Sequence, residues 1–191
     1  MNERRLLKSQ IIAAWHQCIA EDYRVQRINS ERSLQASLWS RLNSLLSKNR
    51  RMFIEPCIVI RTGMGTLRVF PDLVICSSKE VIGVLELKYK PRAAPEYKKD
   101  IATLSLIAEH RESTAVSNQR FRGQPIDETI YCLSKHILFV WAGVHAITNS
   151  TNKENINSPL YSAGYNELQG CFLELHAETS INSVPKIYVR S

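Results

Sequence analysis

The chain has 191 residues, of which 44% are hydrophobic and 23% are charged, which is the balance of a globular protein large enough to bury one sizeable core. No apolar run reaches the roughly 18–20 residues of a membrane span, and the first residues lack the apolar stretch of a secretory signal. We therefore expect a cytoplasmic protein that is not a membrane protein.

The net charge of +7 is unevenly distributed along the chain. Residues 1–120 hold 20 Lys and Arg against 12 Asp and Glu, whereas residues 121–191 hold 5 against 6. A basic N-terminal part favours a polyanionic partner such as nucleic acid, although solubility alone would explain the charge equally well. The five cysteines form no CxxC pair, which indicates free thiols in a reducing compartment.

Two amphipathic helices are predicted first. The first covers residues 3–20, and the second begins at a cap signal, Asn29–Ser30, and continues to residue 49 with leucines at helical spacing. Three strands follow, over residues 52–61, 67–76 and 80–90. Pro56 predicts an edge position or a bulge in the first of these strands.

The second half of the chain predicts a helix over residues 96–110 and a long buried strand over 136–147. Lys98, Lys99 and Asp100 begin this helix off its apolar face, where they could contact phosphate, although we favour a solvated face for them. A polar loop, a helix interrupted by Gly170 and a short closing strand complete the pattern, over residues 148–159, 165–178 and 185–190.

The resulting order is α–α–β–β–β–α–β with a less regular tail, which predicts an α/β fold with a mixed sheet flanked by helices. We expect one domain over residues 1–191. Its parts would be the N-terminal helix 3–20, a core over about 30–148 and a C-terminal extension over 150–191.

Three ionisable residues, Asp72, Glu86 and Lys88, interrupt the apolar second and third strands. Such side chains seldom lie in a buried strand unless they are paired or bind a metal. A turn at Ser77–Lys79 makes the numbers of paired residues sum to about 156, which places Asp72 opposite Val84 and diagonal to Glu86. Lys88 shares that face because side chains alternate along a strand.

This grouping of two acids and a base predicts a particular chemistry. Two neighbouring carboxylates repel each other unless they share a proton or a metal ion. Oxygen ligands of this kind suit Mg²⁺ or Mn²⁺, and a nearby lysine can orient or help to deprotonate a water molecule. These are the groups required for metal-assisted hydrolysis of a phosphodiester.

The motif also resembles that of a known family. "PD" at Pro71–Asp72, thirteen residues, and then "ELK" at Glu86–Lys88 resembles the PD-(D/E)xK nuclease superfamily, which has the restriction-endonuclease-like fold. The α–β–β–β–α–β core of that fold resembles the order predicted for residues 30–148.

The resemblance implies a role for each motif residue. Asp72, Glu86 and the carbonyl of Leu87 would bind Mg²⁺ or Mn²⁺, and Lys88 would position or activate the attacking water. Many members carry a further glutamate on a helix before the sheet, and Glu31 matches its placement. Glu31 could equally be an acid that is favourable at the N-terminus of a helix.

Two functions therefore remain open. The first is a metal-dependent nuclease that acts on nucleic acid, with DNA favoured, through Glu31, Asp72, Glu86 and Lys88. The second is an inactive domain of the same fold that binds nucleic acid or a protein partner. A metabolic hydrolase is a weaker third reading, because no nucleophile elbow, P-loop or dinucleotide motif is present. The oligomeric state stays open, with a homodimer among the options.

Overall fold

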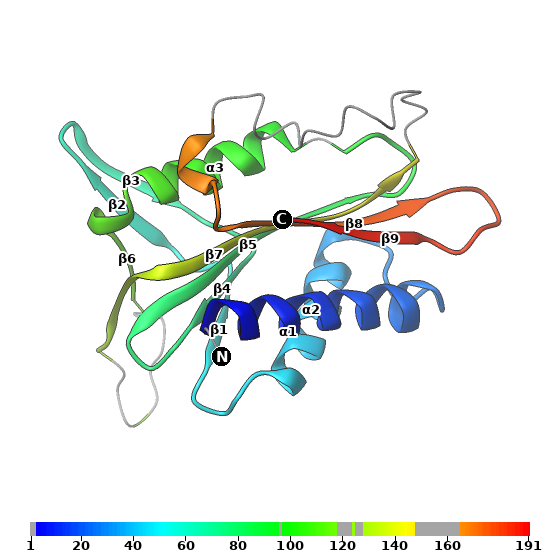
Figure 1. The fold of residues 1–191 in the computed structure, drawn as a ribbon, viewed down its shortest axis with the longest axis horizontal. Coiled ribbons are helices and arrows are strands. Elements are labelled where there is room, and N and C mark those ends of the chain that lie inside the picture. The colour runs from blue at the N-terminus through cyan, green and yellow to red at the C-terminus, as the bar shows by residue number, and fades with distance from the viewer. Residues whose placement is uncertain (1–2, 96, 118–123, 125–127, 148–164) are drawn as a thin grey trace.

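The fold is seen in a computed structural model (Figure 1). The described residues are 3–95, 97–117, 124, 128–147 and 165–191. The polar loop expected over residues 148–159 lies outside them. No helix in the described part of the chain combines the length and the apolar character needed to cross a membrane.

Both predicted N-terminal helices are present. The first, α1 (Glu3–Gln17), continues directly into one π-helical segment (Cys18–Tyr23), and α2 (Glu31–Leu45) follows. Ser30 begins α2, because its side chain accepts a hydrogen bond from the backbone N–H of Ser33 and the Ser33 hydroxyl accepts one from that of Ser30. The second helix is shorter than expected, because the backbone at Leu46 is extended.

The first two predicted strands form one long hairpin that is interrupted in the middle. Its four pieces are β1 (Arg51–Ile54), β2 (Ile58–Thr62), β3 (Gly65–Val69) and β4 (Leu73–Cys76). Pairing of β1 with β4 and of β2 with β3 keeps the same register on both sides of the interruption, with Ile54 opposite Leu73 and Ile58 opposite Val69. At the interruption Glu55 has a φ of 46°, so the predicted strands 52–61 and 67–76 are each broken by an irregular segment.

The interruption sends the two halves of the hairpin to different parts of the sheet. The half nearer its ends joins β5 (Glu80–Lys90) through β4, and the half nearer its tip joins β6 (Thr114–Ser117) through β2. The strand order is β1-β4-β5-β7-β6-β2-β3, where β7 spans Ile130–Ala146. The crossover helix α3 (Lys98–Glu109) lies between β5 and β7 in sequence, and these two strands are parallel, as predicted.

The helix expected over residues 165–178 is wrong. One turn of 3-10 helix (Asn166–Leu168) is followed by β8 (Phe172–Thr179), which pairs in parallel with β7, and β9 (Lys186–Arg190) pairs antiparallel with β8. The residues of β8 are buried on both faces, and the strand lies between β7 and β9. Leu173, Leu175 and Ala177 alternate with polar residues, which is the spacing of a strand and not of a helix.

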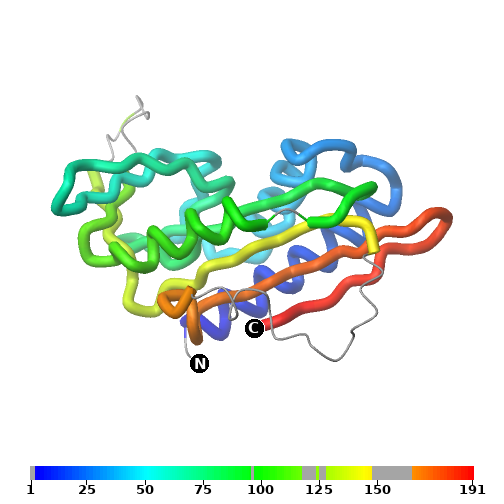
Figure 2. The backbone as a smooth tube through the Cα atoms, turned by 90° about the horizontal axis from the view of Figure 1, so that it is seen from above, coloured from blue at the N-terminus to red at the C-terminus, as the bar shows by residue number. Residues whose placement is uncertain are grey.

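Two apolar cores lie on opposite faces of the sheet (Figures 1 and 2). The helices α1 and α2 cover one face, where Leu85 and Leu87 of β5 are buried, and α3 covers the other, where Val84 is buried. The order of α2, the two strands of the interrupted hairpin, β5, α3 and β7 reproduces α–β–β–β–α–β. The predicted α/β class, with a restriction-endonuclease-like mixed sheet flanked by helices, is confirmed.

Candidate functional site

Asp72 lies at the interruption of the long hairpin, directly before β4. Its backbone carbonyl accepts hydrogen bonds from the side-chain amide of Gln35 on α2 (2.9 Å) and from the backbone N–H of Glu55 (3.0 Å). Its carboxylate accepts a hydrogen bond of 2.6 Å from the backbone N–H of Leu87 on β5. Both the backbone and the side chain of Asp72 are thus held in place by neighbouring elements.

The register of the hairpin between β4 and β5 differs from the expected one by two residues. Leu73 pairs with Leu85, so the next position aligns Asp72 directly with Glu86 and not with Val84. One residue of this difference comes from the turn, where Ser77 pairs with Glu80 and not with Lys79, and the other from a β-bulge near the end of β4, which inserts an extra residue on the β5 side. The two acids are therefore closer than the diagonal placement predicted from the turn alone.

The carboxyl groups of Asp72 and Glu86 share a hydrogen bond in a partly buried position. Burial, followed by the charge of its neighbour Asp72, raises the pKa of Glu86 well above its usual range. Burial also raises the pKa of Asp72, against the opposing effect of the Leu87 N–H. The pair therefore retains a proton more readily than isolated carboxyl groups do, since two buried carboxylates at this separation repel each other when both are ionised.

Lys88 lies between two acids that come from different helices. Its Nζ is 3.6 Å from Oε2 of Glu31 on α2 and 3.5 Å from Oδ2 of Asp100 on α3. Burial alone would lower the pKa of Lys88, but the carboxylates of Asp100 and Glu31 outweigh it and raise the pKa. The ammonium group is therefore charged and held beside the acid pair.

Beyond Leu85, β5 no longer pairs with β4, and two carboxylates bind to the free edge of β5 that results. Asp72 accepts a hydrogen bond from the N–H of Leu87, and Glu31 accepts one from the N–H of Tyr89 at 3.1 Å. In an extended strand the N–H and C=O of one residue point to the same side, so the carbonyl of Leu87 faces this edge as well. Glu31 thus reaches the predicted site from the first turn of α2, and the cap of that helix is supplied by Ser30.

Asp100 was expected on a solvated helix face, and this expectation is wrong. Lys98 and Lys99 are exposed, but Asp100 is 8% exposed and accepts a hydrogen bond of 3.2 Å from Nε1 of Trp141. Its spacing of four residues before Leu104 places it on the buried stripe of α3. That spacing is the signal by which the sequence could have identified it.

The donor set is compatible with a hard divalent cation. Among the residues that the structure describes, no group of three or more His, Cys, Asp or Glu side chains is arranged to hold a metal ion. The groups that converge on the free edge of β5 are nonetheless carboxylate and carbonyl oxygens, the ligands that Mg²⁺ and Mn²⁺ prefer. Two adjacent carboxyl groups that repel each other when ionised are stabilised by a bound cation, so the residues fit such an ion.

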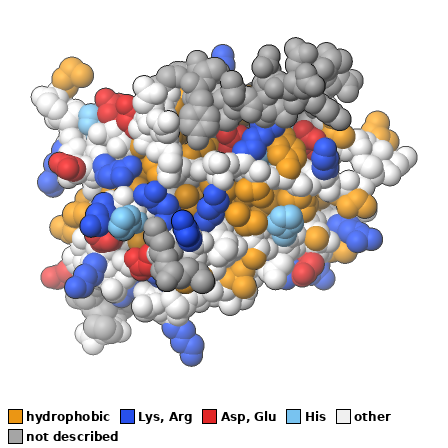
Figure 3. Space-filling view, in the orientation of Figure 1, with side chains coloured by type: hydrophobic (Ala, Val, Ile, Leu, Met, Phe, Trp, Pro, Cys, Tyr) orange, Lys and Arg blue, Asp and Glu red, His pale blue; other side chains and the backbone are white. Residues whose placement is uncertain are grey.

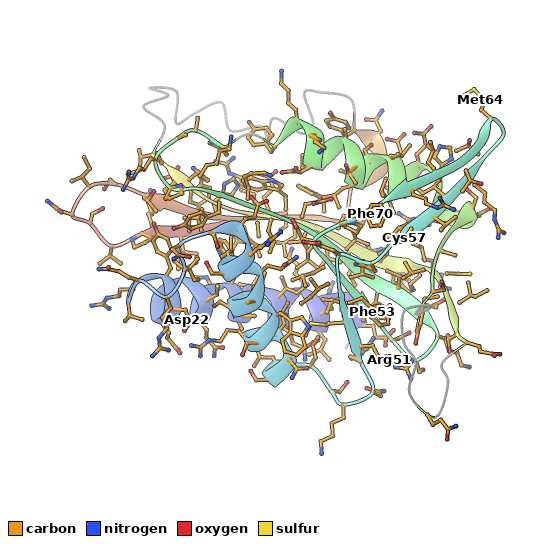
Figure 4. All side chains as sticks on the ribbon, turned by 180° about the vertical axis from the view of Figure 1, so that it is seen from behind. Asp22, Arg51, Phe53, Cys57, Met64 and Phe70 are labelled. Atoms are coloured by element: carbon orange, nitrogen blue, oxygen red, sulfur yellow. The ribbon has the colours of Figure 1, made fainter. Side chains whose placement is uncertain are left out.

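Exposed basic residues lie on the hairpin that leads into Asp72. Lys and Arg are scattered over the face shown in Figure 3, with acidic side chains between them. The β2–β3 arm, defined as residues 56–71, contains Arg61 and Arg68, both exposed, and no acidic residue. Met64 is fully exposed at its far end (Figure 4), and its base leads directly into Asp72.

Comparison with known proteins gives little further information. No family model and no curated protein sequence matches the chain. Among solved structures, NucC of P. aeruginosa in its cAAA-bound form is similar over 100% of this chain and 85% of that chain, with 12% sequence identity and a TM-score of 0.44. This likeness is too slight to support an argument about the function of the chain.

Proposed function

We propose that the chain is a metal-dependent nuclease that hydrolyses phosphodiester bonds in the cytoplasm, with DNA as the favoured substrate. The observation that carries the proposal is the meeting of Asp72 and Glu31 on successive amides of the free edge of β5. Glu86 and Lys88 of the same strand lie beside them. These are the residues of the PD…ELK motif together with the glutamate that precedes the sheet.

Each residue has a distinct role in the proposed reaction. Asp72, Glu86 and the Leu87 carbonyl would hold Mg²⁺ or Mn²⁺, and Glu31 would assist as a further ligand or by positioning water. The ion would supply charge stabilisation at the scissile phosphate and a water of lowered pKa. Lys88 would orient the attacking water and stabilise negative charge that develops on the phosphate oxygens.

The proposed partner is nucleic acid, and two observations support it. Net charge is +7, and most of the excess lies in the part of the chain that carries the motif. The β2–β3 arm, whose base leads into Asp72, carries two exposed arginines and no acidic residue. Phosphate contacts of this type give affinity without sequence specificity.

The direct experiment is a cleavage assay with purified protein and Mg²⁺ or Mn²⁺ on linear, circular and single-stranded DNA and on RNA. We expect cleavage of at least one DNA substrate, its loss in EDTA and its loss in Asp72→Ala. Glu80→Gln is a matched control, because Glu80 is an exposed acid at the start of the same strand as Glu86. Binding of nucleic acid without cleavage under every condition would instead support an inactive nuclease-fold domain.

A further inference from the structure

Asp100 is a buried acid whose position is fixed from two directions. It lies in the first turn of α3, on the sheet face that also carries Glu86 and Lys88. One carboxylate oxygen, Oδ2, is 3.2 Å from Nε1 of Trp141 and 3.5 Å from Nζ of Lys88. A buried carboxylate is costly to retain unless its charge and its hydrogen-bonding capacity are satisfied, so this geometry requires both partners.

Trp141 is itself held firmly. It lies next to Glu86 in the register between β5 and β7, and its ring covers Gly143. A Cβ atom at Gly143 would lie 2.2 Å from Cη2 of the indole, so only glycine leaves room for the ring there. The ring of Tyr97 packs edge-on against the indole at 5.7 Å, and the ring of His176 lies 5.2 Å away. The direction of the indole N–H is therefore fixed by the sheet.

The ammonium group of Lys88 has acids on two sides. Glu31 approaches it from α2 and Asp100 from α3, at nearly equal distances of 3.6 and 3.5 Å. Without Asp100, the flexible lysine side chain could turn toward Glu31 alone or onto the Asp72–Glu86 pair. Opposed attractions from both sides hold the Nζ atom beside the acid pair.

From this geometry we infer that Asp100 is a positioning residue for Lys88, and that Trp141 holds Asp100 in the orientation this requires. The inference rests on the proposed function for its consequence in catalysis, but not for the contacts themselves. Asp100 lies outside the PD…ELK motif. The charge of Asp100 also helps to raise the pKa of Glu86, so the test must isolate the route through the lysine.

A double-mutant cycle tests this route directly. Asp100→Asn keeps the shape and can still accept from the indole N–H, but it loses the charge that attracts Lys88. We expect kcat to fall by roughly 10- to 100-fold with little change in KM, because small errors in the placement of a reacting group have effects of this size. In a Lys88→Ala background the same substitution should have no further effect on kcat.

Two controls separate positioning from a general loss of structure. Glu109→Gln removes an exposed acid from the other end of α3 and should leave kcat unchanged. Asp100→Asn should melt cooperatively, as the wild type does. An equal loss of kcat on adding Asp100→Asn to Lys88→Ala would overturn the inference, since Asp100 would then act without the lysine.

A second measurement does not depend on activity. NMR relaxation of the Lys88 Nζ and Cε nuclei should show a restricted side chain in the wild type, with the exposed Lys79 as a mobile reference. Asp100→Asn should make Lys88 mobile, and Trp141→Phe, which keeps an aromatic ring but removes the N–H, should do so in part. Unchanged Lys88 dynamics in Asp100→Asn would contradict the inference. A lysine released in a protein that cuts no nucleic acid would support the positioning contact and overturn the proposed function.

Discussion

The carboxylate of Glu31 accepts a hydrogen bond from the backbone N–H of Tyr89 at 3.1 Å, across 58 residues of sequence. This contact brings the first turn of α2 to the free edge of β5. The capping role that Glu31 could have had is filled by Ser30 and Ser33. The structure therefore favours an interaction with the site over a purely local role in the helix.

Substitution of Glu31 separates these two roles. Glu31→Gln should lower the rate of cleavage at least several-fold while changing the melting temperature little, because the cap remains intact. Ser30→Ala is the complementary control. It should lower stability by about 0.5–2 kcal/mol through loss of the cap and leave the rate of cleavage per folded molecule unchanged. If Glu31→Gln altered only the melting temperature, the role of Glu31 at the site would be excluded.

The acid pair predicts an unusual dependence of stability on pH. The folded-state pKa values of Asp72 and Glu86 are raised above those of the unfolded chain, chiefly by burial. Protonation of the pair therefore stabilises the fold below the ordinary carboxyl range near pH 4, and this contribution is lost as pH rises through the raised values. Its loss should continue from acidic pH into the alkaline range.

Asp72→Asn tests this dependence in EDTA. The amide can still accept from the Leu87 N–H and can donate to Glu86, but it carries no charge. We expect the variant to be more stable than the wild type at pH 8, by on the order of 1–2 kcal/mol, and to show a flatter pH dependence in urea unfolding. A variant that is less stable than the wild type at pH 8 would show that the two carboxyls do not repel each other in the fold.

Metal binding should displace the proton that the pair holds. Calorimetric titration with Mn²⁺ at pH 7, repeated in buffers of different ionisation enthalpy, should report binding with release of about one proton. Asp72→Ala should abolish this binding, and Glu80→Gln should preserve it. Equal affinity in the wild type and in Asp72→Ala would place the ion somewhere else.

The sequence predicted the helices α1, α2 and α3, the crossover and the presence of the acids in one hairpin. It did not predict how the acids meet. The turn lies where it was expected, but it pairs Ser77 with Glu80, and the bulge near the end of β4 adds a second residue to the shift, so that Asp72 aligns with Glu86. Gly83 lies beside the extra residue, Ile82, and an isolated glycine inside a strand is a signal for a bulge that the prediction did not use.

Two other features were misassigned although the sequence carried a signal for each. β8 has Leu173, Leu175 and Ala177 on the face toward α1 and α2, with Glu174 and His176 buried on the other face. Residues 173–178 thus alternate strictly between apolar and polar, which is the pattern of a strand, and the helix prediction overlooked it. Asp100 was assigned to solvent because it is charged, whereas its position on the buried stripe of α3 decided its environment.

The β2–β3 arm provides a test of the nucleic-acid partner. The exposed side chains of Arg61 and Arg68 lie on the same face of the arm. Arg61 pairs with Thr66, so these two share a face, and Arg68 is two residues beyond Thr66 on the same strand. The double substitution Arg61→Ala and Arg68→Ala should weaken DNA binding and lower the slope of log K against log salt by up to about 2. Arg5→Ala, an exposed arginine on α1, should change neither. An unaltered slope in the double variant would exclude the arm from the interface.

Lys88 distinguishes an enzyme from a binding domain most directly, because a lysine is not needed to hold the metal. Lys88→Ala should keep Mn²⁺ binding and most DNA binding, and it should lose Mg²⁺-dependent cleavage by about 10²–10⁴-fold, the typical contribution of a positioned proton-transfer group. Lys88→Arg should restore little, since a guanidinium differs in shape and stays protonated. Lys79→Ala, in the exposed turn of the same hairpin, should cut as the wild type does. The decisive measurement is thus the cleavage rate of wild type, Lys88→Ala and Lys79→Ala at equal Mn²⁺ and DNA occupancy. We predict that cleavage is lost in Lys88→Ala alone. Equal rates in all three proteins, or no cleavage by the wild type, would contradict the proposed nuclease function.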